Sequence, residues 1–383
     1  MPLTIRRAAA VLLVAVLGLA PQRCWAALAF NVGGTWDTDA RRSAAVAALQ
    51  LVVDRYNAFG TFGNGNVYVY YSSGIPTAQA SYNGSMGFGG TWPAERVAMH
   101  EMAHYLGLPS GSWSTLFATG TWAGAMAGRL VRQFDGEDAA LRGDTMHFWP
   151  YGLNYDSEGS EINKQRQVAV VYGMRADLGI GSKAEPSSAT TVALTSSDAV
   201  GESGFHYQSR WSDAHFAHPG AAYSTGDFAL RTPASGGSFR FYGDSLTIDN
   251  RNDPAGGLFF KGTGTSAVTT IPSLVLDGGW IHHYTTTADV FRLAGRMTVA
   301  ADSTIHAKQG TIDVLSRVVG AAAISVPVTD APTEDARYVR FLSADNAYTG
   351  SIAVAGRAPI SGSCSASPDP PTRSTVRRRA ACG

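Results

Sequence analysis

The sequence predicts a two-domain protein, with an α+β domain followed by an all-β domain built as a β-solenoid. The chain has 383 residues, which is long for a single domain. Its first half alternates between helix-like and strand-like apolar patterns, whereas its second half contains short β-prone runs separated by Gly, Asp and Asn. Hydrophobic residues make up 45% of the chain, charged residues 16%, and the formal net charge is zero. This composition is typical of a packed protein and argues against disorder or a nucleic-acid partner.

Residues 1–26 have the three parts of a secretory signal peptide. Arg6 and Arg7 form a positive n-region, residues 8–20 an apolar core, and residues 24–26 a small-x-small cleavage site. The apolar core is too short for a bilayer, which needs roughly 20 residues, and no later segment is long and apolar enough. We therefore expect a secreted or cell-surface protein without a transmembrane segment.

Removal of the signal leaves two cysteines, Cys364 and Cys382, both in the tail at 358–383. The tail is basic and of low complexity, so we expect it to be disordered. The two thiols can pair in an oxidising compartment, but they cannot staple either domain. Both domains must therefore be held together by burial of apolar surface.

The α+β prediction for residues 27–181 follows from the order of its patterns. A stretch with helical apolar spacing comes first, then two Val-, Tyr- and Gly-containing strand patterns, then two more helical stretches. The predicted elements are a helix at 38–59, strands at 66–73 and 83–90, a helix at 93–106 and, after a long loop, a helix at 161–179. Helices and strands in this order predict an α+β arrangement.

The helix predicted at 93–106 contains His100, Glu101 and His104 in the order H-E-x-x-H. Two histidines four apart lie on one face of a helix, so both imidazoles can reach one ion. The glutamate between them projects close enough to take a proton from an attacking water. The motif predicts a Zn²⁺ site with Glu101 as general base; a helix with no metal is the alternative.

The segment HEMAHYLG, which ends at Gly107, resembles the metzincin metallopeptidases. In that family a glycine breaks the active-site helix and the chain swings round to a third zinc ligand. The resemblance covers roughly residues 30–180 and implies a metzincin-like catalytic domain. It would place the third ligand at Ser110, but a serine hydroxyl is a very poor zinc ligand. The sequence departs from the family at that position.

His147 is the candidate that remains for the third ligand. Between the signal and residue 200 the histidines are His100, His104 and His147, and zinc prefers imidazole, thiolate or carboxylate. Asp144 is the runner-up, because its carboxylate lies three residues away. The alternative for His147 is a packed loop histidine that hydrogen-bonds to backbone.

Four further residues have candidate roles near this motif. Met146 or Met174 can be the methionine that lies beneath the metal in metzincins, although a core position is the commoner place for a methionine. Tyr151 and Tyr155 can each donate a hydrogen bond to a developing oxyanion. Aromatic packing explains either tyrosine equally well.

The segment 182–191 has the composition of a linker, and the pattern of apolar residues changes after it. Apolar runs without helical periodicity recur through residues 192–357, which is typical of a β-solenoid whose coils bury their faces against one another. The clearest runs lie at 237–249, 257–262, 273–283, 291–300, 310–319 and 339–356. A β-sandwich is the competing architecture.

Several of these runs resemble the autotransporter-associated β-strand repeat, above all LSADNAYTGSIAVAG, and the likeness covers roughly residues 205–356. The resemblance implies a right-handed parallel β-helix on an exported protein of a Gram-negative bacterium. A second metal site among His282, His283, His215 and His218 is not expected. Neighbouring residues on a strand point to opposite faces, and no carboxylate lies at ligand spacing.

These observations predict a secreted zinc metallopeptidase that acts on a protein or peptide, with a β-solenoid that contacts an extracellular glycan or cell-surface partner. The rival is a catalytically inactive surface adhesin whose peptidase-like domain lacks its third ligand. A weaker third hypothesis is that the metal domain binds or acts on glycans. The intact His100, Glu101 and His104 favour the peptidase, because an adhesin need not keep the glutamate.

Overall fold

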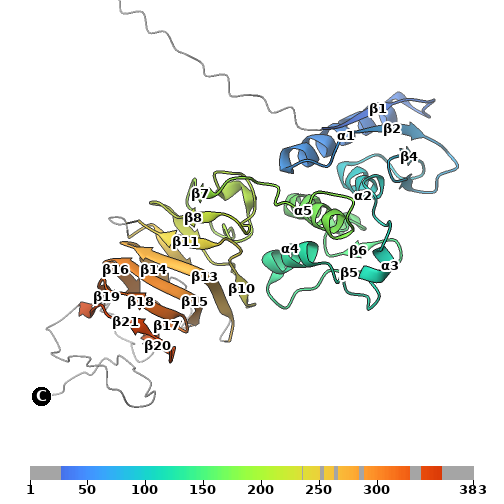
Figure 1. Ribbon diagram of the computed structural model, residues 1–383. Coiled ribbons are helices and arrows are strands. Elements are labelled where there is room, and N and C mark those ends of the chain that lie inside the picture. The colour runs from blue at the N-terminus through green and yellow to red at the C-terminus, as the bar shows by residue number, and fades with distance from the viewer. Residues whose placement is uncertain are drawn as a thin grey trace, which may run out of the picture.

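The computed structural model describes residues 27–234, 236–250, 254–262, 266–283, 289–327 and 338–355. The predicted signal peptide at 1–26 lies outside the described residues, as do the predicted basic tail at 358–383 and its two cysteines. Figure 1 shows a helical body with a small sheet, followed by a stack of strands.

The first half is an α+β arrangement, as predicted. Its elements are β1 (Leu28–Val32), α1 (Asp39–Phe59), β2 (Gly65–Tyr71), β3 (Ala78–Ala80), β4 (Ser85–Phe88), α2 (Glu95–Tyr105), α3 (Trp113–Leu116), α4 (Ala125–Asp135), β5 (Arg142–Gly143), β6 (Phe148–Trp149) and α5 (Glu161–Asp177). Four strands form one sheet in the order β1-β2-β4-β3, in which only β3 is antiparallel to its neighbour. The pair β5 and β6 forms a separate hairpin.

One face of the four-stranded sheet packs against helices and the other does not. Along β2 the side chains alternate, so that Val67 and Val69 are buried in the core while Tyr68 points away from it. Three helices are tied together within that core by a chain of buried polar contacts. The Tyr56 hydroxyl of α1 donates to Gln167 of α5, whose amide donates to the Met99 carbonyl of α2. This chain fixes the helix that carries H-E-x-x-H.

Helix α2 ends at a glycine for a conformational reason. Gly107 has φ +99°, a region that favours glycine. A Cβ at this position would lie 2.8 Å from Ile180 and 2.9 Å from Tyr82. The carbonyl of Leu106 accepts a hydrogen bond from the guanidinium of Arg175, so the end of the helix is held by α5.

The second half is a β-solenoid of about five turns. One parallel sheet contains β7 (Thr191–Ala193), β8 (Ala222–Ser224), β10 (Phe239–Arg240), β11 (Ser245–Ile248), β13 (Val268–Asp277), β15 (Val290–Ala301), β17 (Thr311–Val314), β18 (Arg317–Gly320), β20 (Val339–Phe341) and β21 (Ala347–Tyr348). The other contains β9 (Ala229–Arg231), β12 (Gly257–Phe260), β14 (Trp280–His283), β16 (Ser303–His306), β19 (Ile324–Pro327) and β22 (Ile352–Ala355).

Every pairing between these named strands is parallel, so the β-sandwich alternative is wrong for the described residues. The apolar residues of successive coils lie in register. Leu258, Ile281 and Ile305 are aligned across β12, β14 and β16, and all three are completely buried. Stacked rows of this kind form a core of their own, separate from that of the first half.

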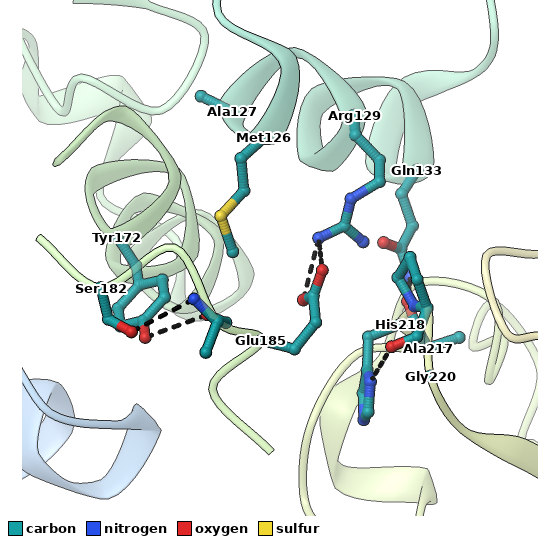
Figure 2. Close-up of polar contacts among 12 residues, drawn as sticks. Met126, Ala127, Arg129, Gln133, Tyr172, Ser182, Glu185, Ala217, His218 and Gly220 are labelled. Atoms are coloured by element: carbon teal, nitrogen blue, oxygen red, sulfur yellow. Dashed lines mark hydrogen bonds and ion pairs between the residues drawn. The ribbon is translucent and has the colours of Figure 1, made fainter. Parts of the chain in front are cut away.

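The predicted linker lies against the first half, and the two halves contact each other through α4 (Figure 2). Glu185 of the linker pairs with Arg129 of α4 at 2.7 Å. The buried Gln133 amide of α4 donates to the carbonyls of Phe205 and Ala217 in the second half. Phe216 packs into the core of the first half although it follows the linker in sequence. The solenoid is therefore anchored to the α+β body by buried contacts.

Among the described residues, none of the helices combines the length and apolar character that a membrane-spanning helix needs.

Candidate metal centre

His100 and His104 lie one turn apart on α2 and present their ring nitrogens to each other. Their Nε2 atoms are 3.3 Å apart. Each Nδ1 faces a backbone carbonyl: that of His100 contacts the Gly152 oxygen at 2.8 Å, and that of His104 contacts the Leu108 oxygen at 2.5 Å. Because a carbonyl only accepts, Nδ1 must carry the proton in both rings, which leaves both Nε2 lone pairs free.

Burial keeps both rings neutral. It lowers the pKa of His100 to about 4, against the opposing effect of the Gly152 carbonyl, and it also lowers the pKa of His104. A neutral imidazole is the form that binds a metal. At neutral pH the two side chains are therefore in the state that a metal site needs.

His147 joins this pair from the loop between β5 and β6. One ring nitrogen from each of His100, His104 and His147 lies within 4.8 Å of the others. The side chain of His147 is 44% exposed, so this corner of the cluster opens to solvent. Among the described residues, no other group of three or more His, Cys, Asp or Glu residues comes together in this way.

Asp144 shapes the loop that carries His147 and is not part of the cluster. Its Oδ1 accepts the backbone N–H groups of Met146 and His147, both at 2.7 Å, and lies 3.8 Å from His147 Nδ1. These two backbone donors hold the pKa of the Asp144 carboxyl below its usual range. Ser110, the position that the metzincin resemblance indicated, is not among the residues that line the cleft around the histidines.

The spacing of the His100 and His104 nitrogens fits a zinc ion. Two ligands that each lie 2.0–2.1 Å from one ion, at a tetrahedral angle, are roughly 3.3–3.4 Å apart. The separation of 3.3 Å between the Nε2 atoms of His100 and His104 agrees with this value. Three imidazoles, one of them open to solvent, match the donor set of a catalytic site, which keeps one position for water or substrate.

Glu101 projects from the same helix into the same cleft. Its side chain is 5% exposed, and Oε2 has no hydrogen-bond partner within the protein. Burial raises the pKa of its carboxyl to about 7, although the positive charge of Arg96 opposes this effect. A buried carboxyl with a pKa near neutrality can both accept and return a proton, as a general base must.

The cluster opens into a cleft of about 620 Å³. One wall is the β3 strand with the turn that follows it, up to Tyr82, and another is formed by Leu108 and Pro109. All of its lining residues precede the linker. The solenoid therefore contributes no described side chain to the cleft.

Met146 and Met174 lie in different environments. Met146 lines the cleft beside His147 and is half-exposed, whereas Met174 is fully buried in the core. Neither tyrosine candidate lines the cleft. The hydroxyl of Tyr151 donates to Asp135, and that of Tyr155 belongs to a side chain that is 71% exposed.

Arg96 and Asn154 are among the cleft residues that were not predicted from the sequence. Arg96 lies one turn before His100 on α2, and its guanidinium donates to the Leu153 carbonyl and pairs with Asp156. Asn154 donates from its amide to the Phe148 carbonyl. Both residues hold the 148–156 segment over the histidines. The sequence signal that could have indicated Arg96 is its position four residues before His100, on the same face of the predicted helix.

Two histidines of the second half, His282 and His283, pack against aromatic rings. His282 stacks on Phe259 with ring centroids 4.4 Å apart, and His283 points to the other side of β14, where it packs on Phe260. This matches the expected alternation along a strand. His218, by contrast, pairs with Asp213 at 3.2 Å, so the expectation that no carboxylate lies near these histidines was wrong for this residue.

No protein-family model matches the chain, and neither a curated protein nor a solved structure shows a significant match to it.

Proposed function

We propose that this protein is an exported zinc-dependent peptidase, with His100, His104 and His147 as metal ligands and Glu101 as general base. The observation that carries the proposal is the convergence of three imidazoles beside a buried, unpartnered carboxyl in one open cleft. Export is supported by the signal-like residues 1–26.

A metzincin-like identity is the finer part of the proposal. It is supported by the H-E-x-x-H-x-x-G segment and by the positive φ of Gly107, which turns the chain away at the end of α2. An autotransporter-associated origin for the solenoid, in a Gram-negative bacterium, is supported by its sequence repeats alone.

A zinc ion at the three histidines would acidify the attacking water and polarise the scissile carbonyl. The chain's own residues do the rest. Glu101 takes the proton of the water at its free Oε2 and returns it to the leaving amine. The carbonyls of Gly152 and Leu108 keep the His100 and His104 rings in a fixed orientation and tautomer throughout.

A peptide substrate suits the shape of the cleft. Among the described strands β3 pairs only with β4, so its other edge is open, and its residues line the cleft. An extended chain can add to such an edge through backbone hydrogen bonds, which are independent of side-chain identity. A peptide bound in this way would run alongside α2, close to the three histidines.

The test is peptide hydrolysis by zinc-loaded mature protein and by its Glu101→Gln variant. The variant should keep its zinc, because the histidines are untouched, and should lose about 10²–10⁴-fold or more in turnover. Glu161→Gln is the matched control, since Glu161 lies outside the cleft on the exposed start of α5. Turnover by Glu101→Gln close to that of the control would exclude the base. Zinc binding by the unsubstituted protein without any hydrolysis would favour the adhesin.

A further inference from the structure

The outer face of the four-stranded sheet is uncharged. The register places eight residues on this face, in the rows Ala29–Asn66, Asn31–Tyr68–Ser85 and Tyr70–Gly87–Gln79. None of them carries a charge, and three are amides. Exposed faces of small domains are usually rich in charged residues, at about a quarter to a third of positions. A partner that complements this face is therefore neutral.

Two tyrosines lie low on this face. Their rings are nearly parallel, at 18°, with centroids 6.2 Å apart. Tyr68 leans over Gly33, where a Cβ would come within 2.6 Å of its ring. Tyr70 leans over Gly87, where a Cβ would come within 2.8 Å of its ring and within 2.4 Å of the buried Ile75 side chain. Glycine at these two positions lets the rings rest against the sheet. Tyr68 remains 44% exposed.

Amide groups surround the two rings. Asn31 is exposed in the same row as Tyr68 and Asn66 in the row beside it, and the Gln79 amide reaches the Tyr70 hydroxyl at 3.4 Å. Each amide offers both a donor and an acceptor. Gln79 also lines the catalytic cleft, so the face continues into it.

We propose that this face, centred on Tyr68 and Tyr70, binds a neutral polysaccharide. The C–H face of a sugar ring packs against an aromatic ring, and its hydroxyls exchange hydrogen bonds with amides. Two adjacent rings bordered by amides, without any charge, provide these contacts for consecutive sugar units. The binding needs neither the metal nor Glu101, so it stands apart from the proposed peptidase activity.

The proposal is tested by affinity electrophoresis of the mature protein in gels that contain hydroxyethylcellulose, xylan or galactomannan. At least one of these should retard the protein, with and without EDTA. The double variant Tyr68→Leu/Tyr70→Leu should lose about tenfold or more in affinity, because two aromatic contacts are removed. Leucine keeps apolar bulk over the two glycines, and an unchanged circular dichroism spectrum checks the fold.

Two controls sharpen the result. Tyr68→Phe keeps the ring and should bind nearly as well as the unsubstituted protein. Phe228→Ala removes an exposed aromatic side chain from the solenoid and should change nothing. No retardation by any of the three polysaccharides, or equal retardation of the double variant, would overturn the proposal. So would equal retardation by anionic alginate, or binding to a neutral glycoprotein alone.

Discussion

Replacement of Gly107 by alanine tests how the end of α2 supports the metal centre. The backbone at this position has φ +99°, which costs an alanine about 1–2 kcal/mol. The added Cβ would also lie 2.8 Å from Ile180 and 2.9 Å from Tyr82, and overpacking by one methyl group costs about 1–3 kcal/mol. Together these terms predict a loss of roughly 2–5 kcal/mol in the free energy of unfolding.

The same substitution should weaken metal binding. Leu108 follows Gly107, and its carbonyl holds the Nδ1 of His104, so a shift of this turn disturbs the ring. Loss of such an orienting contact typically lowers metal affinity by about 10–100-fold. Urea unfolding and competition for zinc with a chromogenic chelator measure the two effects.

Gly111→Ala is the matched control. Gly111 also has a positive φ, at +53°, but a Cβ there would meet nothing within 4 Å. The free energy of unfolding of this variant should fall by only about 1–2 kcal/mol, and the variant should bind zinc normally. Equal effects of the two substitutions on stability and on zinc affinity would refute the assigned role of the Gly107 turn.

Three further predictions concern other parts of the molecule. Gln133→Leu leaves the carbonyls of Phe205 and Ala217 without their donor, so the free energy of unfolding should fall by about 1–3 kcal/mol per carbonyl. Limited proteolysis should also cut the 182–191 linker faster. An unchanged rate of cleavage would show that this contact does not hold the halves together. Burial lowers the pKa of His282 to about 4 from the ordinary 6.5, so the unfolded chain binds a proton between these pH values and the folded chain does not. Stability is therefore lost as the pH falls from 6.5 towards 4, by up to about 3 kcal/mol. His282→Phe should reduce the difference between the urea unfolding midpoints at pH 7.5 and pH 4.5. A difference as large as in the unsubstituted protein would contradict the burial argument. Asp144→Ala should weaken zinc binding about 10–100-fold, because the loop that carries His147 loses its two hydrogen bonds to the carboxylate. Asp144→Asn should bind zinc nearly normally, because its amide oxygen can still accept the two N–H groups. An equal loss of zinc affinity in both variants would make Asp144 a ligand.

Local patterns predicted most of the elements but not all. The helices at 38–59, 93–106 and 161–179 correspond to α1, α2 and α5. Helix α4 was interpreted as loop, although Ala127, Leu130, Val131 and Phe134 have the i, i+3, i+4, i+7 spacing of a buried helix face. Its glycine and its lack of a side-chain cap weakened the signal.

Strands β1 and β3 were missed for another reason. Both are short. β1 pairs with β2, which follows α1 in the sequence, and β3 lies at the edge of the sheet with a single partner strand among the described residues. In the second half the β-prone runs contain or overlap most of the strands, because each coil repeats the same buried rows, but β7, β8, β9, β16 and β19 lie outside them. The linker boundary could not indicate that Phe216 packs into the first core, since such a contact depends on how the halves dock.

The candidate site divides in the same way. The facing of His100 and His104 follows from helical spacing alone, so the sequence was sufficient to predict it. The approach of His147 depends on the loop that Asp144 shapes, and no spacing rule predicts it. His147 was proposed as a ligand because it was the remaining histidine in the first half. The carbonyls of Gly152 and Leu108, which fix the two tautomers, are tertiary contacts that no local pattern indicates.

The most direct test of the central claim is the zinc coordination of the mature protein, measured by X-ray absorption or by a crystal structure of the zinc-loaded chain. The account predicts one zinc ion per chain with three imidazole nitrogens at about 2.0–2.1 Å, one of them from His147. The His147→Ala variant should lose one nitrogen from the shell and most of its affinity. A carboxylate in place of the third imidazole, or a protein that binds no zinc, would contradict the account.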